Sequence, residues 1–135
     1  MNSKRAFLDT AFVVALVNQN DQHHPKALKL SKKFEHQRLV TTDVILLEIG
    51  NALSKNFKRE SVEIIETIRA AEEIQIIELN AEIFENAFQM YAKYLDKSWG
   101  LVDCVSFVVM QNEKITDALT SDIHFRQAGF NILMG

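Results

Sequence analysis

The sequence predicts an α/β fold in which helices sandwich a parallel sheet, all within one domain. Its 135 residues are close to the usual size of a single domain, and no linker, repeat or low-complexity segment divides residues 1–135. Short apolar runs that suit buried strands alternate with longer segments whose apolar residues recur at helical spacing. Such an alternation favours parallel strands joined by helices. With only one proline and four glycines, the turns are expected to be short.

The expected strands are short and mostly apolar, as buried parallel strands usually are. The first runs from Ala6 to Asp9 and carries three apolar residues before its acid. The others are expected at 38–41, 74–79, 115–120 and 131–134.

The expected helices fill the segments between those strands. Thr10 lies near the start of the first helix, and Asn80 is placed to cap a later one. Isoleucines at helical spacing indicate an amphipathic helix over 61–73, whereas 101–110 is apolar almost throughout. The full set is 10–17, 21–34, a helix from a cap at Thr42 or Asp43 to about 56, 61–73, the segment after Asn80, and 101–110.

Composition is that of an ordinary globular protein. Apolar residues make up 47% of the chain and charged residues 24%. No apolar run reaches the ~18–20 residues of a membrane helix, and the apolar run near the start is too short for a signal peptide. We therefore expect a cytoplasmic location and no membrane partner. The single cysteine, Cys104, lies in an apolar stretch and is expected to be buried.

Charge is spread unevenly along the chain. Residues 1–59 hold ten Lys and Arg against five Asp and Glu, a net charge of +5, and residues 60–135 have a net charge of −8. A basic first part suggests a surface for polyanions. Charge alone still favours ordinary solvated helix faces over a nucleic-acid surface.

Two acids interrupt helical stretches that otherwise carry no charge. Glu48 is the only charged residue in 44–53, and Asn51 follows it by three residues, which places both on one helix face. Asp103 is the only charged residue in 101–110. Because neither stretch contains Lys or Arg, neither acid has a basic partner on its own helix.

Two further acids follow expected strands. Asp9 ends the first strand, and Asp122 comes shortly after the strand at 115–120, directly behind Thr120 and Ser121. Ligands of open α/β sheets bind at the carboxyl ends of the strands. We therefore expect Asp9 and Asp122 at that edge.

These four acids predict a metal site. A buried carboxylate without a partner is costly, and two like charges ~4 Å apart repel by about 4 kcal/mol at an effective dielectric near 20. A divalent cation removes the conflict, because Mg²⁺ and Mn²⁺ prefer carboxylate and water oxygens. The prediction is one shared site made by Asp9, Glu48, Asp103 and Asp122.

Each acid also has an ordinary explanation. Asp9 or Asp122 alone can cap a helix or a turn, and Asp103 can cap the helix that follows Gly100. Glu48 can pair with a distant lysine. A single shared site explains all four acids, whereas the separate explanations must all hold at once.

The same residues resemble the motifs of PIN domains. Residues 7–12, Phe-Leu-Asp-Thr-Ala-Phe, are similar to the opening motif, in which Asp and Thr or Ser follow an apolar strand. Residues 21–27 and 47–53 resemble the next two segments, the second of which has a Glu and a trailing Asn. Residues 101–104 resemble the third motif, and 118–125 the fourth, Thr-x-Asp-x-x-Phe. Any one motif is weak, but their order and spacing match over nearly the whole chain.

The resemblance implies a three-layer α/β/α sandwich with a short, mostly parallel sheet of four or five strands. It also implies cleavage of single-stranded RNA with Mg²⁺ or Mn²⁺. Many small members that resemble this chain are VapC-type toxins of bacterial toxin–antitoxin pairs, which form dimers and are inhibited by an antitoxin. An RNA substrate, an antitoxin and a homodimer are therefore expected. Arg126 departs from the pattern, because some members carry a further acid there, which leaves the second metal position open.

We expect hydrolysis of phosphodiester bonds by metal-activated water. Asp9, Asp103 and Asp122 are expected to hold the metal, and Glu48 to bind it or to deprotonate the attacking water. The residues expected to contact the substrate or to support the acids are Thr10, Asn51, Thr120 and Ser121. Candidates for steering the RNA backbone are Lys4, Arg5, Lys55 and Lys58.

Other function classes fit less well. A haloacid-dehalogenase-like phosphatase needs a second Asp two residues after the first, where this chain has Ala11. A response-regulator receiver needs paired early acids and a late lysine, and neither stands at the expected place. The sequence has no Gly-rich phosphate loop. A PIN-like binding module without turnover, and a nuclease outside a toxin–antitoxin pair, for instance one acting on DNA, stay as alternatives.

Overall fold

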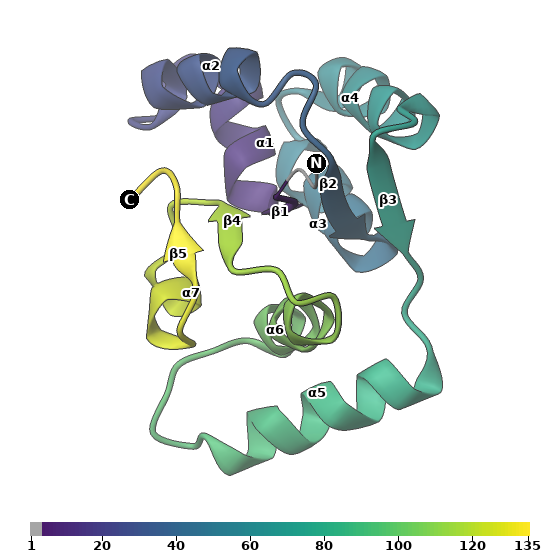
Figure 1. Cartoon of the computed structure of the whole chain (residues 1–135). Helices are drawn as coiled ribbons and strands as arrows, with labels where there is room; N and C mark the ends of the chain where they lie inside the picture. Colours follow the sequence, from purple (N-terminus) through teal and green to yellow (C-terminus); the bar gives the residue numbers. More distant parts are fainter. Residues whose placement is uncertain (1–3) are drawn as a thin grey trace.

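A five-stranded, all-parallel sheet forms the centre of the computed structural model, which describes residues 4–135. The strands are β1 (Ala6–Leu8), β2 (Leu39–Thr42), β3 (Ile74–Ile77), β4 (Asp117–Leu119) and β5 (Asn131–Ile132). Their order across the sheet is β3-β2-β1-β4-β5 (Figure 1). The predicted parallel sheet is confirmed, with each strand close to its expected position; β2 is shifted by one residue and the other four strands are shorter than expected.

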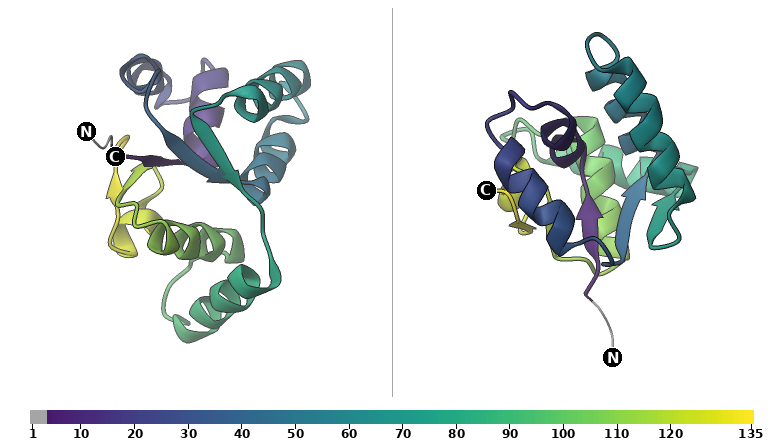
Figure 2. Two further views of the ribbon diagram at one scale, coloured as in Figure 1. Left: turned by 45° about the vertical axis from the view of Figure 1, so that its right-hand side comes forward. Right: turned by 90° about the horizontal axis from the view of Figure 1, so that it is seen from above.

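Helices cover both faces of this sheet. They are α1 (Thr10–Val17), α2 (His24–Lys33), α3 (Asp43–Leu53), α4 (Lys58–Ala70), α5 (Ala81–Lys93), α6 (Leu101–Asn112) and α7 (Ile123–Gln127). Figure 1 shows α1 to α4 on one side of the sheet and α5 to α7 on the other. In Figure 2, α5 is the outer helix and packs on α6. The predicted three-layer sandwich is confirmed.

Two predicted helix caps are present. The side chain of Thr42 accepts a hydrogen bond from the Ile45 N–H at the start of α3, and that of Asn80 accepts one from the Ile83 N–H at the start of α5. Both contacts satisfy a backbone donor that the first helical turn leaves free. The short helix α7 was not expected; it begins at Ile123, and the carboxylate of the preceding Asp122 caps it.

The order of the strands places the ends of β1 and β4 side by side. The chain runs outward from β1 to β2 and β3, then returns through α5 and α6 to β4 on the other side of β1. Leu8 pairs with Leu119 at the end of the two strands. The segments that follow β1 and β4 therefore diverge at a topological switch point, where open α/β sheets bind their ligands.

Helix α6 has an almost continuously apolar sequence because it lies in the core. Every residue of this helix from Cys104 to Met110 is buried, including the free Cys104 thiol. Phe107 lies at the centre of an aromatic cluster, with ring centroids 5.2 Å from Trp99 and 5.0 Å from Phe125. These contacts fix α6 and α7 against each other. Among residues 4–135, no helix has the length and apolar character to cross a membrane.

Candidate metal centre

Four elements bring acids to one pocket at the carboxyl edge of the sheet. Asp9 follows β1, Glu48 lies on α3, Asp103 lies in the first turn of α6, and Asp122 precedes α7. All four line a pocket of about 410 Å³. The structure therefore brings together the four acids that the sequence analysis grouped.

Asp9 is the most buried of the four acids. Only 7% of its surface is exposed, and Thr120 Oγ1 donates a hydrogen bond of 2.7 Å to its Oδ2 atom. The pKa of Asp9 is raised to about 7, chiefly by burial and also by the charges of Glu48 and Asp103, although the hydrogen bond from Thr120 lowers it. The protein therefore holds this carboxylate where its negative charge is disfavoured.

Thr120 links the ends of two strands. Its fully buried hydroxyl donates to Asp9 and accepts a hydrogen bond of 3.0 Å from the Asp122 N–H. Asp122 Oδ1 in turn accepts from the His124 N–H at 2.9 Å, which is the cap of α7. One hydroxyl thus fixes Asp9 and the start of the segment that carries Asp122.

Thr10 holds Glu48 in a similar way. The Thr10 hydroxyl, in the first turn of α1, donates a short hydrogen bond to Glu48 Oε1 on α3. Thr10 was expected to contact the substrate or to support the acids, and in this structure its hydroxyl contacts the Glu48 carboxylate. Thr10 and Ser121 both line the pocket.

Asp103 is held by the backbone and by a histidine. Its Oδ2 atom accepts a hydrogen bond of 3.0 Å from the Gly100 N–H and lies 3.0 Å from Nδ1 of His124. The same Nδ1 atom lies 3.4 Å from Asp122 Oδ1. Ligand atoms of Asp103, Asp122 and His124 all lie within 4.8 Å of one another, as the ligands of one metal ion do.

Within the described residues, His124 is the one basic side chain that contacts these acids. From Lys4 to Gly135, no Lys or Arg nitrogen lies within 4.0 Å of a carboxylate of Asp9, Glu48, Asp103 or Asp122. The acids are instead oriented by hydroxyl and backbone donors, which leave the negative charge in place. A donor set of several carboxylate oxygens fits a hard divalent cation such as Mg²⁺ or Mn²⁺.

Some expected residues lie elsewhere. Asn51 is exposed and does not line the pocket, where Ala52 lies instead. Lys4 and Arg5 are at the opposite end of β1 and pair with Asp117 and Glu113, so both lie away from the four acids.

Two residues at the centre were not in the expected site. Asp21 lines the pocket, and its carboxylate accepts a hydrogen bond of 2.8 Å from the His23 N–H. His124 contacts Asp103 and Asp122. Asp21 lies within one of the PIN-like segments, and His124 lies two residues after Asp122, so the sequence did place both near the recognised motifs.

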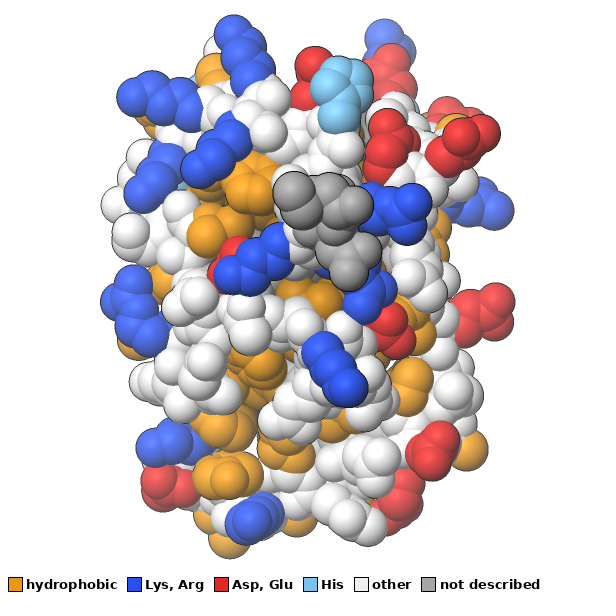
Figure 3. Space-filling model, in the orientation of Figure 1, with side chains coloured by type: hydrophobic (Ala, Val, Ile, Leu, Met, Phe, Trp, Pro, Cys, Tyr) orange, Lys and Arg blue, Asp and Glu red, His pale blue; other side chains and the backbone are white. Residues whose placement is uncertain are grey.

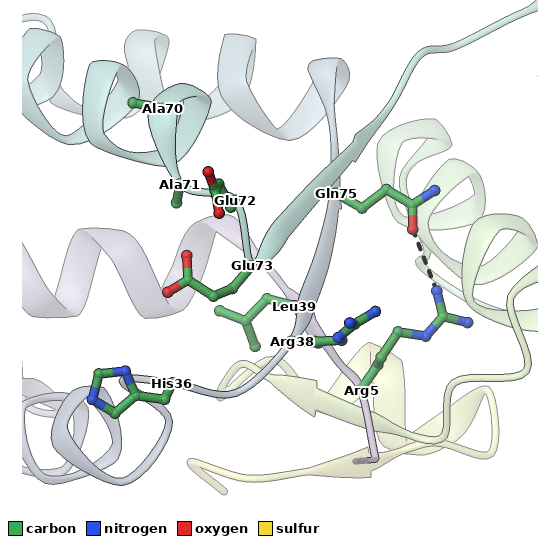
Figure 4. A pocket seen from close by; sticks show the side chains of 9 residues that line it. All are labelled: Arg5, His36, Arg38, Leu39, Ala70, Ala71, Glu72, Glu73 and Gln75. Atoms are coloured by element: carbon green, nitrogen blue, oxygen red, sulfur yellow. Dashed lines mark hydrogen bonds between the residues drawn. The ribbon is translucent and has the colours of Figure 1, made fainter. Parts of the chain in front are cut away.

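A larger hollow lies at the opposite edge of the sheet. It measures about 880 Å³ and is lined by Arg5, Arg38, Glu72 and Glu73 among others (Figure 4). Arg5 is held there by Gln75, at 3.4 Å, and by Glu113. Since charges of both signs line this hollow and none of the four acids does, it is a separate feature from the candidate metal centre.

The PIN domain family model matches residues 6–131, and the chain belongs to that family. The chain is 27% identical over 124 residues to the 23S rRNA-specific endonuclease VapC20 of Mycobacterium tuberculosis, a match that covers 92% of this chain and 94% of that protein.

Solved structures agree with this assignment. The crystal structure of VapC20, described as a Sarcin-Ricin loop cleaving toxin of Mycobacterium tuberculosis, matches with a TM-score of 0.84 and 25% identity, covering 93% of this chain and 95% of that one. A toxin–antitoxin complex from Klebsiella pneumoniae matches with a TM-score of 0.60 at 14% identity, covering 87% of each chain, which shows the shared fold.

Proposed function

We propose that this chain is a divalent-metal-dependent endoribonuclease that hydrolyses RNA phosphodiester bonds and serves as the toxin of a toxin–antitoxin pair. The observation that carries the proposal is the pocket in which Asp9, Glu48, Asp103 and Asp122 meet, with no Lys or Arg of residues 4–135 paired to any of them. Membership of the PIN family and the likeness to an rRNA endonuclease along almost the whole chain support it.

Three of the four acids would hold the cation, and the fourth would accept a proton. Asp9, Asp103 and Asp122 would hold the cation, because their carboxylates line the same pocket. When bound, a divalent cation lowers the pKa of bound water and offsets negative charge on the phosphate. Thr120 orients Asp9 through its 2.7 Å hydrogen bond and so presents the other carboxylate oxygen to the pocket.

Glu48 is the candidate general base. Hydrolysis forms a bond from a water oxygen to phosphorus and breaks a phosphorus–ribose oxygen bond, so the water must lose a proton. Thr10 holds one oxygen of Glu48, which limits rotation of the carboxylate and leaves the other oxygen to accept that proton. Glu48 is half-buried on the wall of the pocket, where it can reach a water.

A lysine-rich helix supplies a surface for the RNA backbone. The exposed lysines of α2 are Lys26, Lys29, Lys32 and Lys33. Figure 3 shows Lys and Arg side chains gathered over this helix, at the upper left of the view. The helix begins three residues after the pocket-lining Asp21. We therefore add these lysines to Lys55 and Lys58 as candidates for contacts with phosphates.

An antitoxin and a second copy of the chain are the proposed protein partners. The likeness to a structure described as a toxin–antitoxin complex supports the first of these. A short coding sequence beside the gene, with a DNA-binding start, would support the pairing further.

The experiment that tests this function is an RNA cleavage assay. The purified protein is incubated with structured RNA, unstructured RNA and single-stranded DNA, with Mn²⁺, with Mg²⁺ and with a chelator. We expect RNA cleavage that needs the metal and disappears in Asp9→Asn and Asp103→Asn. Cleavage that survives either change would refute the assigned roles. Cleavage of DNA alone would indicate a DNA nuclease, and absence of both cleavage and metal binding a silent binding module.

A further inference from the structure

His124 directs a ring nitrogen at two of the acids. Its Nδ1 atom lies 3.0 Å from Asp103 Oδ2 and 3.4 Å from Asp122 Oδ1. Two oxygens of an octahedral metal ion that occupy neighbouring positions are separated by about 3 Å, because each bond is about 2.1 Å long. The two distances from Nδ1 are close to this separation, and the ligand atoms of the three residues lie within 4.8 Å of one another, which suits three ligands of a single ion.

The other ring nitrogen has a partner of its own. Nε2 of His124 lies 3.2 Å from the Ser98 hydroxyl. When Nε2 carries the proton and donates it to Ser98, Nδ1 presents a lone pair to two carboxylate oxygens. Three acceptors then face one another with no hydrogen among them, an arrangement that a cation stabilises. Histidines that bind metals are usually oriented by such a hydrogen bond from the second nitrogen.

The fold holds this imidazole in place. His124 lies on α7 between Asp122, which caps the helix, and Phe125, which is fully buried against Phe7 and Phe107. Beside Ser98, Trp99 Nε1 donates a hydrogen bond of 3.0 Å to Gln127 Oε1 at the end of α7. The segment that carries Ser98 is thereby tied to the helix that carries His124, so their contact is fixed from both sides.

We propose that His124 Nδ1 is a direct ligand of the divalent cation held by Asp103 and Asp122, and that the centre consequently prefers Mn²⁺ to Mg²⁺. This inference rests on the proposed metal-dependent function. Carboxylate and water oxygens suit both ions, but an imidazole nitrogen favours a first-row transition ion such as Mn²⁺ more than it favours Mg²⁺.

Pulsed electron paramagnetic resonance of Mn²⁺ bound to the protein tests this ligand directly. A histidine ligand produces a ¹⁴N coupling on the Mn²⁺ signal. We expect this coupling in the wild-type protein and in His36→Asn, a control that changes an exposed histidine paired with Glu35. We expect it to disappear in His124→Asn. Calorimetry should show Mn²⁺ affinity falling about tenfold or more in His124→Asn, with a smaller change for Mg²⁺.

The outcomes separate the two proposals. Mn²⁺ bound by the wild-type protein without ¹⁴N coupling would overturn the ligand role, and His124 would then only position the acids. An equal loss of Mn²⁺ and Mg²⁺ affinity in His124→Asn would overturn the preference. Failure of the wild-type protein to bind Mn²⁺ at all would instead refute the metal centre. Absence of the coupling from the wild-type spectrum overturns the ligand role whether or not the variant folds, and a coupling that persists in folded His124→Asn would overturn it as well.

Discussion

Acidic side chains have different partners at the amino edge of the sheet, where the strands begin, and at the carboxyl edge, where the strands end. At the amino edge, Lys4 pairs with Asp117 at 3.7 Å and Arg5 with Glu113 at 3.0 Å. At the carboxyl edge, Asp9 is contacted by a threonine hydroxyl and has no Lys or Arg partner among residues 4–135. Both edges belong to the same short strands, so strand geometry alone does not set this difference.

The acids at the amino edge are neutralised by ion pairs, whereas those at the carboxyl edge keep a charge that can attract a cation. An ion pair on the surface neutralises its own charge and adds little to stability. Hydroxyl and backbone donors orient a carboxylate and leave its charge to attract a cation from solution. The raised pKa of Asp9 is the electrostatic consequence of this arrangement.

The largest expected effect is the loss of RNA cleavage when Asp122, shortly after β4, is replaced. Asp117, the first residue of β4, provides the comparison. Asp122→Asn keeps a capping side chain for α7, because Asn caps helices as well as Asp does, but it removes a carboxylate from the pocket. We expect RNA cleavage to fall about 10³-fold, as for the loss of a few kcal/mol of transition-state stabilisation. Asp117→Asn should stay within about twofold of the wild type. Equal losses in a rate assay would contradict the distinction between the two edges.

Removing the charge of Asp9 should change the pH dependence of stability in the metal-free protein. Its folded pKa of about 7 lies above the ordinary 3.8, so the folded state binds this proton more tightly than the unfolded state. The resulting stability is present below pH 3.8 and is lost as pH rises to 7. The loss is at most about 4 kcal/mol, since one pKa unit corresponds to about 1.4 kcal/mol.

Asp9→Asn should therefore be more stable than the wild type at pH 8 without metal, with the difference shrinking toward pH 4. Urea unfolding of the two proteins in the presence of a chelator, followed by circular dichroism, measures the free energy of unfolding of each at each pH. Added Mn²⁺ should stabilise the wild type and have little effect on the variant. A wild-type protein whose stability does not fall between pH 4 and 7 more than that of the variant would count against the raised pKa.

The α2 lysines should matter for RNA binding in a salt-dependent way. Lys26→Ala/Lys29→Ala removes two exposed charges near the pocket, whereas Lys93→Ala/Lys97→Ala removes two on or just after α5. If both α2 lysines contact phosphates, the slope of log affinity against log salt should become shallower by about 1.4. The control pair should leave the slope unchanged in a fluorescence anisotropy titration. Equal slopes in all three proteins would exclude α2 from the RNA surface.

The smallest effect is expected for Lys4→Ala. The Lys4 side chain is 69% exposed and lies 3.7 Å from its partner, so the pair should contribute no more than about 0.5 kcal/mol. Urea unfolding should show a change of that size and the cleavage rate should not change. A clear loss of cleavage would mean that the amino edge takes part in the reaction.

Much of the fold followed from local pattern. The ends of the strands could be predicted because apolar runs stop abruptly at Asp9 and before Ser121. The starts of two helices could be predicted because Thr42 and Asn80 are good capping residues. The helix α7 was missed because its five residues are too short to display a helical period.

The site was less predictable in its details. Glu48 and Asn51 are separated by three residues, a rotation of about 300°, and residue 52 lies closer to the face of Glu48 at about 400°. Ala52 accordingly lines the pocket and Asn51 does not. The contact of His124 with Asp103 depends on how α7 packs against α6, a tertiary feature that no local spacing encodes.

Calorimetric titration of Mn²⁺ is the most direct test of the central claim that distant acids converge on one cation. The wild-type protein is compared with Asp9→Asn/Asp122→Asn, and Asp117→Asn serves as a control for a change at the other edge. We predict saturable binding in the wild type and the control and none in the double variant. No binding by the wild type, or equal binding by the double variant, would contradict the account.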